Sequence, residues 1–151
     1  MNSLEQKIGM QIASFTYVIE RGKIKEFVQA IGDNNSIYYD LKEALKQGYN
    51  DIPIPPTFPT CIEMWAGANF DELIEQLELN PLHVLHGEQS YQYYKDVCAG
   101  DTIYGKTIVK HIERKKNMTF VTLQTDYFNE NDDLVLTATS TILERQEVND
   151  K

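Results

Sequence analysis

Apolar residues at helical spacing dominate the first half of the chain. In each of the stretches 22–31 and 70–77, four apolar residues fall at positions i, i+3, i+4 and i+7, which predicts one amphipathic helix in each. A shorter helix is predicted over 41–47, because turn formers precede it and a glycine follows it. The stretch 60–68 has so few polar residues that it predicts a helix buried on most sides.

In the second half of the chain the pattern changes to alternation of apolar and polar residues. Strands are predicted over 89–94, 103–109, 119–127 and 134–143, and an earlier one over 15–20. Short polar turns separate the last four strands, which is typical of an antiparallel meander. Helices placed before a meander of this kind predict the α+β class.

The segment 51–59 lies between these two halves and carries four prolines. Each proline fixes φ and removes a backbone donor, so the segment predicts a rigid extended loop. A mostly buried helix followed by a long antiparallel sheet packs economically when the sheet curls round the helix. Periodicity alone leaves other α+β folds open.

The length of 151 residues suits a single domain over 1–151, with an expected ordered core at about 8–146. The composition of 42% hydrophobic and 25% charged residues is ordinary, but the formal net charge is −9. That charge argues against a nucleic-acid partner, which requires clustered Lys and Arg. The one basic cluster, at 114–116, falls in a predicted hairpin turn.

The sequence contains no sign of a membrane segment, a metal site or a cofactor. No apolar stretch suits a signal peptide or a membrane span, so we expect a cytoplasmic protein without a membrane partner. Cys61 and Cys98 lie far apart, and we expect reduced thiols. Histidines and cysteines lack metal-ligand spacing, and nucleotide-binding and nucleophile-elbow motifs are absent. We therefore expect neither a metal nor a cofactor.

One segment resembles a known signature. Residues 27–38, Phe-Val-Gln-Ala-Ile-Gly-Asp-Asn-Asn-Ser-Ile-Tyr, resemble the hydratase signature of MaoC-like proteins, in which a helix ends in Gly-Asp and x-Asn-Pro-aliphatic-His follows. Two further segments, 54–59 and 85–89, look like the N-terminal-type MaoC dehydratase domain. Together the three segments span most of the chain in the expected order.

The resemblance implies a fold and a chemistry. The fold is a single hot dog, in which an antiparallel sheet of about five strands curves round a buried central helix, and two such units pair into a double hot dog. The chemistry is the reversible hydration of a 2-enoyl thioester, in which an Asp and a His of the signature activate the water. Backbone N–H groups at a helix N-terminus bind the thioester carbonyl, because a developing enolate needs preorganised donors.

Carried over to this chain, the resemblance places Asp33 at the aspartate position and Asn35 at the asparagine position. Tyr38 stands where the histidine is expected, and a tyrosine with an ordinary pKa of about 10 is a weak base at neutral pH. The standard catalytic pair is therefore absent. His86 is the remaining candidate histidine, in a His-Gly-x-Gln segment, although its ring also suits a structural role. Asp33 likewise fits an ordinary turn.

Candidate substrate-binding residues come from two places. Tyr38 can line an acyl tunnel or donate a hydrogen bond, or it can simply pack. The others lie near the start of the predicted apolar helix: Pro59, Thr60, Cys61 and Trp65. The helix dipole there can lower the pKa of a thiol, and its free N–H groups can bind a thioester oxygen. The alternative for Cys61 is a buried inert thiol.

Three functional hypotheses follow. In the leading one, the chain is the acyl-thioester-binding subunit of a (3R)-hydroxyacyl-thioester dehydratase (2-enoyl-thioester hydratase), and a second hot-dog chain supplies the catalytic pair. In the second, it is a stand-alone homodimeric enoyl-CoA hydratase or thioesterase that uses Asp33 and His86. In the third, it binds acyl-CoA or lipid without catalysis.

All three hypotheses expect two hot-dog chains to pair, because a lone curved sheet leaves an edge strand exposed. The sequence leaves open whether the partner is a second copy or a different chain. It also leaves open the acyl chain length and the carrier, CoA or acyl carrier protein. The acidic net charge mildly disfavours docking of an acidic carrier on this chain, and a basic patch on a partner can compensate.

Overall fold

Five strands form one antiparallel sheet in the computed structural model, which describes residues 4–146. The strands are β1 (Gln11–Val18), β2 (Val84–Tyr93), β3 (Thr102–Lys115), β4 (Met118–Phe128) and β5 (Leu134–Arg145). The helices are α1 (Arg21–Ile31), α2 (Leu41–Lys46), α3 (Pro59–Ala66) and α4 (Phe70–Leu77), with short 3-10 helices η1 (Glu5–Lys7), η2 (Ser36–Tyr38) and η3 (Pro81–His83). The strand order is β1-β3-β4-β5-β2. The predicted α+β class and number of strands are confirmed.

Alternation along the long strands buries one face of the sheet. Every second residue of β4 from Thr119 to Tyr127 is buried, as the period of a strand requires. Phe15 on β1 and Ile103 on β3 are buried with them. The basic cluster at 114–116 lies at the end of β3 and in the turn to β4, as predicted. One face of the sheet therefore requires a cover of helices.

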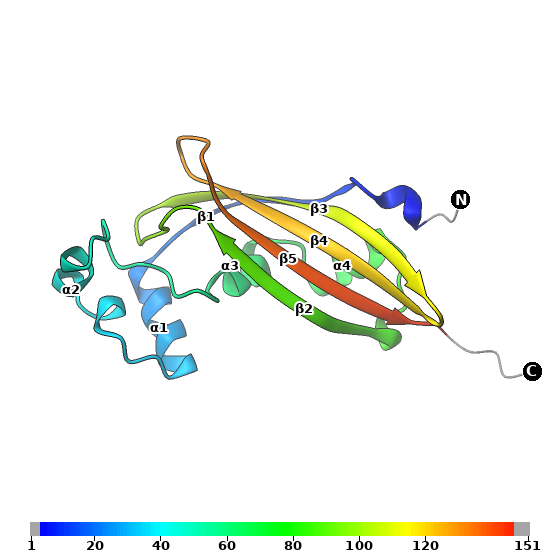
Figure 1. Cartoon of the computed structure of the whole chain (residues 1–151), viewed down its shortest axis with the longest axis horizontal. Helices are drawn as coiled ribbons and strands as arrows, with labels where there is room; N and C mark the ends of the chain where they lie inside the picture. Colours follow the sequence, from blue (N-terminus) through cyan, green and yellow to red (C-terminus); the bar gives the residue numbers. More distant parts are fainter. Residues whose placement is uncertain (1–3, 147–151) are drawn as a thin grey trace, which may run out of the picture.

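Helices α3 and α4 supply this cover. Figure 1 shows both of them behind the sheet, whereas α1 and α2 stand beyond one of its ends. Ile62 of α3 packs in one cluster with Phe15 and Tyr127 of the sheet, while Leu77 of α4 packs in a second cluster with Val121. The sheet thus curves round the central helix α3, which is the predicted hot-dog arrangement.

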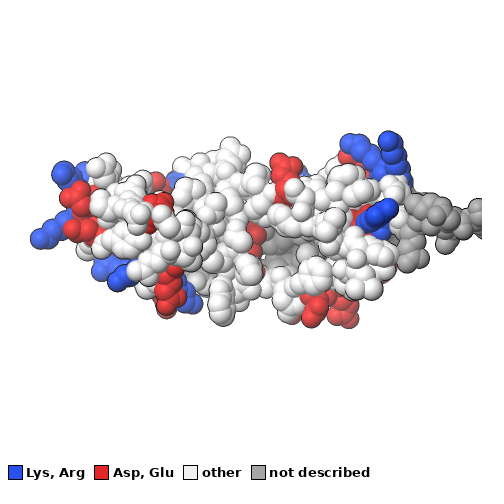
Figure 2. Space-filling view, turned by 90° about the horizontal axis from the view of Figure 1, so that it is seen from below, with Lys and Arg blue, Asp and Glu red and all other residues white. Residues whose placement is uncertain are grey.

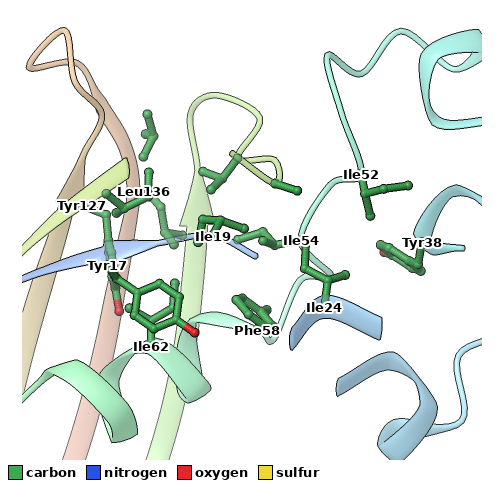
Figure 3. Packing of buried hydrophobic residues seen from close by; sticks show 14 of the residues in the cluster. Tyr17, Ile19, Ile24, Tyr38, Ile52, Ile54, Phe58, Ile62, Tyr127 and Leu136 are labelled. Atoms are coloured by element: carbon green, nitrogen blue, oxygen red, sulfur yellow. The ribbon is translucent and has the colours of Figure 1, made fainter. Parts of the chain in front are cut away.

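The larger buried cluster joins the sheet to the segments before it. Figure 3 shows Tyr17 and Tyr127 from the sheet beside Ile62 of α3, with Phe58 and Ile24 farther along. Ile24 is fully buried on α1, and Phe58 is 1% exposed at the end of the proline-rich loop. Both α1 and the proline-rich loop are anchored in the core. The segment between them, which begins with the loop after α1, therefore has a defined position relative to the sheet.

Helix α3 is less buried than its sequence predicts. Met64 is 75% exposed and Trp65 is 79% exposed, whereas Ile62 of the same helix is 1% exposed. A helix that lies on one sheet presents only one side to it, so an apolar stretch of this length leaves its other side uncovered. The prediction of a helix buried on most sides is wrong for this chain taken alone.

Two predicted boundaries also differ from the structure. Pro59 opens α3 instead of ending the loop, because the first turn of a helix has no use for the N–H that proline lacks. Strand β2 begins at Val84, five residues before the start that alternation predicts, and a bulge lies between His86 and Glu88. Most residues of β2 are exposed, so burial gives no two-residue alternation there.

The two edges of the sheet are β1 and β2. On β2, Leu85 is 65% exposed, and the nearby Leu82 is also exposed. An exposed edge strand with apolar side chains offers both free backbone groups and apolar surface to another chain. Within residues 4–146, no helix combines the length and the apolar character that crossing a membrane requires.

Candidate functional site

The loop that follows α1 uses its polar side chains to hold its own shape. Gly32 ends α1 in the left-handed conformation, with φ of 73°. The Asp33 Oδ1 atom accepts a hydrogen bond from the Asn35 N–H at 2.9 Å, and the Asn35 Oδ1 atom accepts one from the Ile37 N–H at 3.2 Å. Both predicted catalytic residues of this loop therefore take part in turns that lead into η2.

Tyr38 is buried at the end of η2. It lines a cavity of about 190 Å³, here called the tyrosine cavity, together with Tyr49, Tyr93 and Asp96. Burial raises the pKa of the Tyr38 phenol above its ordinary value, and the nearby Asp33 carboxylate adds to the shift. Tyr38 thus stays protonated at neutral pH and can donate a hydrogen bond, but it cannot take a proton from water.

A second cavity lies between α1 and α3. It has a volume of about 410 Å³, and Phe27, Phe58, Cys61 and Trp65 contribute to its walls. The Lys23 ammonium group lies 5.8 Å from the centre of the Trp65 ring and 5.4 Å from that of Tyr17. This α1–α3 cavity brings together two of the predicted substrate-binding residues, Cys61 and Trp65.

The thiol of Cys61 is not activated in this surrounding. Burial raises its pKa above the ordinary value of a cysteine, so the thiolate fraction at neutral pH is small. Cys61 and Cys98 are both free, as expected from their separation in the sequence.

The largest of these cavities, about 540 Å³, lies between α3, α4 and the strands β2 and β5. Its walls are mainly apolar, with Met64, Phe70, Leu73 and Ile142 among them. In Figure 2 the molecule is seen from the side of β2, and its surface is hollowed between the positions of α3 and α4 where few Lys or Arg residues lie. This α3–α4 cavity has the apolar lining and the size of a ligand site.

Two predicted residues, Thr60 and His86, reach the α3–α4 cavity. The His86 Nε2 atom lies 3.2 Å from the Ser140 hydroxyl and 3.3 Å from the Gln89 amide oxygen. The Thr60 hydroxyl shares a short hydrogen bond with the Tyr91 hydroxyl. Asp33 is not among the residues that line this cavity, so the structure does not bring the proposed pair of Asp33 and His86 together there.

The sequence did not single out Glu63, which faces the same cavity from α3. Its Oε1 atom accepts a hydrogen bond from the Tyr127 hydroxyl at 2.9 Å. Burial raises the pKa of the Glu63 carboxyl, and hydrogen bonds from Tyr127 and Thr125 oppose the shift. A signal for it existed, because Glu63 is the only charged residue in the apolar stretch 60–68.

The remaining predicted residue, Pro59, is buried at the first position of α3. The predicted site residues are therefore distributed over three cavities and one loop. Tyr38 lines the tyrosine cavity, Cys61 and Trp65 line the α1–α3 cavity, and Thr60 and His86 line the α3–α4 cavity. Helix α3 borders two of these cavities, so it is the element that positions most of the candidate residues.

Known proteins resemble this chain in sequence and in fold. Residues 6–138 match the family described as FAS1-like, dehydratase domain region. A UPF0336 protein of Thermobifida fusca (strain YX) is 32% identical over 129 residues, which cover 85% of this chain and 84% of that protein.

Two solved structures extend the comparison to the fold. A chain of the HadBC (3R-hydroxyacyl-ACP dehydratase) complex from Mycobacterium tuberculosis has a TM-score of 0.78 and 18% identity, and the match covers 91% of this chain and 96% of that one. A MaoC-like dehydratase has a TM-score of 0.85 and 21% identity, over 95% of this chain and 44% of that chain. Both neighbours confirm the predicted hot-dog fold. Since the family match spans most of the sequence, the chain belongs to the FAS1-like dehydratase domain family of MaoC-like hot-dog proteins.

Proposed function

We propose that this chain is the acyl-thioester-binding subunit of a (3R)-hydroxyacyl-thioester dehydratase, which also runs in reverse as a 2-enoyl-thioester hydratase. A second hot-dog chain supplies the catalytic His and Asp. The observation that carries the proposal is the phenol of Tyr38 at the position where the signature calls for histidine. Hydration needs a base that takes a proton from water, and burial keeps this phenol protonated.

The two other signature residues also support acyl binding by this chain and catalysis by its partner. Asp33 and Asn35 bind backbone N–H groups of their own loop through their side-chain oxygens. An aspartate without a histidine beside it lacks the second member of the proton-transferring pair. The loop thus keeps its shape beside the tyrosine cavity, while the proton chemistry falls to the partner.

An acyl chain fits the α3–α4 cavity better than the tyrosine cavity. The first has about 540 Å³ and mainly apolar walls, whereas the second has about 190 Å³ and three phenol groups. Binding an alkyl chain removes apolar surface from water on both sides, at about 25 cal/mol per Å². We therefore place the acyl group between α3 and α4, next to Thr60 at the start of α3.

The partner is proposed to pair at the edge strand β2. Leu85 on β2, Met64 on α3 and Phe70 on α4 are all exposed apolar side chains on elements that border the α3–α4 cavity. Pairing there satisfies free backbone groups of the edge and covers apolar surface in one step. The HadBC dehydratase, a fold neighbour, is itself described as a complex. A second copy of this chain is the alternative occupant of the same edge.

The test is spectrophotometric hydration of short and long 2-enoyl-CoA substrates by the chain purified alone, alongside calorimetric binding of saturated acyl-CoA. We expect binding without enzymatic turnover. Adding a hot-dog chain whose signature holds both Asp and His should produce turnover, and Asp33→Asn in this chain should leave that turnover unchanged. Enzymatic turnover by this chain alone contradicts the proposal.

One observation favours the stand-alone alternative, because Glu63 and His86 line the same cavity. A carboxyl and an imidazole that face one cavity can share acid and base roles. If the chain alone turns over an enoyl-CoA or hydrolyses an acyl-CoA, replacement of His86 by Ala should abolish that activity. If ligand is bound but never converted, even with a histidine-bearing partner, the chain is a binding module without catalysis.

A further inference from the structure

The α3–α4 cavity shares part of its wall with a smaller cavity that lies deeper in the molecule. This inner cavity has a volume of about 120 Å³ and lies between the helices and the buried face of the sheet, where Ile12 and Leu123 contribute to it. Glu63, Leu73 and Ser140 belong to the walls of both cavities. The two spaces therefore meet at these residues.

The inner cavity suits an alkyl group. Its Thr107 and Thr125 hydroxyl groups are hydrogen-bonded to each other at 2.8 Å, so they need no polar ligand. Ile12, Leu73 and Leu123 provide apolar walls. Both threonine hydroxyl groups therefore stay hydrogen-bonded when the end of a hydrocarbon chain occupies this space.

Glu63 is the charged residue at the junction. It projects from α3 toward the sheet, where its carboxyl is held by the Tyr127 hydroxyl of β4 at 2.9 Å. Tyr127 is itself fully buried. A hydrocarbon chain that passes this point must displace the carboxyl from Tyr127 or pack methylene groups against it, and both leave a buried polar group poorly solvated.

We infer that Glu63 sets the length of acyl chain that this protein accepts, by closing the inner cavity to chains that fill the α3–α4 cavity. The inference rests on the proposed acyl-thioester-binding function and adds the substrate class to it: thioesters whose alkyl chain ends before Glu63. Longer chains bind no more tightly than those that fill the outer cavity, because their additional carbons have no apolar space to enter.

The experiment is isothermal titration calorimetry of butanoyl-, octanoyl- and hexadecanoyl-CoA with the purified full chain, below the micelle concentration of the longest ligand. The opening variant is the double substitution Glu63→Ala with Tyr127→Phe, which removes the carboxyl without leaving the buried tyrosine hydroxyl unpaired. Glu63→Gln keeps the shape and the acceptor oxygen. Glu75→Ala removes an exposed carboxylate from the neighbouring helix α4 as a matched control.

In the wild-type protein, affinity should rise from butanoyl- to octanoyl-CoA and then stop rising. The double variant should bind hexadecanoyl-CoA about tenfold or more tightly than the wild type does, since one relieved polar conflict is worth about a factor of ten. Glu63→Gln and Glu75→Ala should keep the wild-type profile. Circular dichroism of each variant verifies that it is folded.

Two results overturn the inference while leaving acyl binding intact. One is a wild-type affinity that keeps rising up to hexadecanoyl-CoA, and the other is an unchanged length profile in the folded double variant. If the double variant does not fold, the wild-type profile decides: affinity that stops rising after octanoyl-CoA supports the inference, and affinity that keeps rising overturns it. Absence of binding of every acyl-CoA to the wild type instead refutes the proposed function, and the inference falls with it.

Discussion

The surroundings of one carboxyl group, that of Glu63 on α3, differ most from what the neighbouring residues in the sequence suggest. Glu63 lies between Ile62 and Met64, in a stretch whose hydropathy predicts simple packing. The structure turns it toward the sheet, where Tyr127 donates a hydrogen bond to it. A partly buried carboxyl that has hydrogen bonds from Tyr127 and Thr125 but incomplete solvation binds protons more readily than an exposed one, and this has a measurable effect on stability.

The pH dependence of unfolding should reveal the partial burial of Glu63. Burial raises its pKa above the ordinary value of 4.5, so the folded chain keeps a proton that the unfolded chain loses as the pH rises. The contribution of Glu63 to the free energy of unfolding therefore falls as the pH increases from about 4.5 through the raised pKa. Glu63→Gln cannot ionise, so its stability relative to the wild type should increase over this window.

Urea denaturation of the wild type and of Glu63→Gln at several pH values between about 5 and 8 measures this difference. Glu75→Gln on the exposed side of α4 is the matched control, and we expect its difference from the wild type to stay constant. A gap between Glu63→Gln and the wild type that does not change with pH would show that Glu63 is solvated in the folded state.

The sequence identifies the residues of the signature, but it does not predict their geometry. The sequence places Asp33, Asn35 and Tyr38 close together because they are close in the chain. It cannot show that the Asp33 and Asn35 side chains bind backbone N–H groups of their own loop. Nor can it place Glu63 against Tyr127, which lies far away in sequence, because such contacts depend on how α3 is rotated about its axis.

At the scale of elements, hydrophobic period predicted the helices and most strands. The helix α4, predicted over 70–77, has those bounds in the structure because its apolar side packs on the sheet. Helix α3 was harder, since uniform apolar character carries no information on which side faces the core. Alternation predicted strand β2 too short, because burial does not alternate along an edge strand that is largely exposed.

The pairing of β1 with β3 depends on one glycine. Gly105 is the direct partner of Phe15, and a Cβ atom at Gly105 would lie 2.1 Å from the Phe15 ring. That ring is buried and packs edge-on against Tyr127, with ring centres 5.9 Å apart, so it has little room to move. Gly105→Ala should therefore lower the free energy of unfolding by about 1–3 kcal/mol, the usual cost of an overpacked core.

Chemical denaturation measures this change, with Gly22→Ala as the matched control. Nothing lies within 4 Å of a Cβ atom at Gly22, which sits in the first turn of α1. Alanine is a better helix former than glycine, so this variant should be as stable as the wild type or slightly more stable. Equal effects of the two substitutions would mean that the contact between Phe15 and Gly105 is not tight.

At the scale of the whole molecule, the order of the strands decides which surface is open. The sequence predicted an antiparallel meander, but alternation does not tell which strands end up at the edges. The structure puts β2 at one edge, although it precedes β3, β4 and β5 in the chain. The hot-dog fold itself was predictable only through the resemblance of three short segments to a family.

If the chain pairs at the β2 edge, a charge placed on that edge should weaken its association in solution. Leu85→Asp puts a charge on the exposed apolar side of β2 and should weaken self-association, or association with a histidine-bearing partner, by about tenfold or more. Val18→Asp, at an exposed apolar position on the opposite edge strand β1, should leave association unchanged.

Sedimentation velocity over a range of concentrations measures both variants against the wild type. A wild-type chain that stays monomeric at micromolar concentration and in the presence of every hot-dog partner contradicts the proposed pairing. Weakening by Val18→Asp but not by Leu85→Asp would place the interface at the other edge of the sheet.

The strand order also governs how the chain is assembled during synthesis. Strands β3, β4 and β5 pair with their neighbours in sequence, so their hairpins can form as soon as they leave the ribosome. The two edge strands pair only after later strands have been synthesised: β1 requires β3, and β2 requires β5. A nascent or truncated chain that ends before Leu134 therefore holds β2 without a partner, and we expect it to require a chaperone and to be degraded.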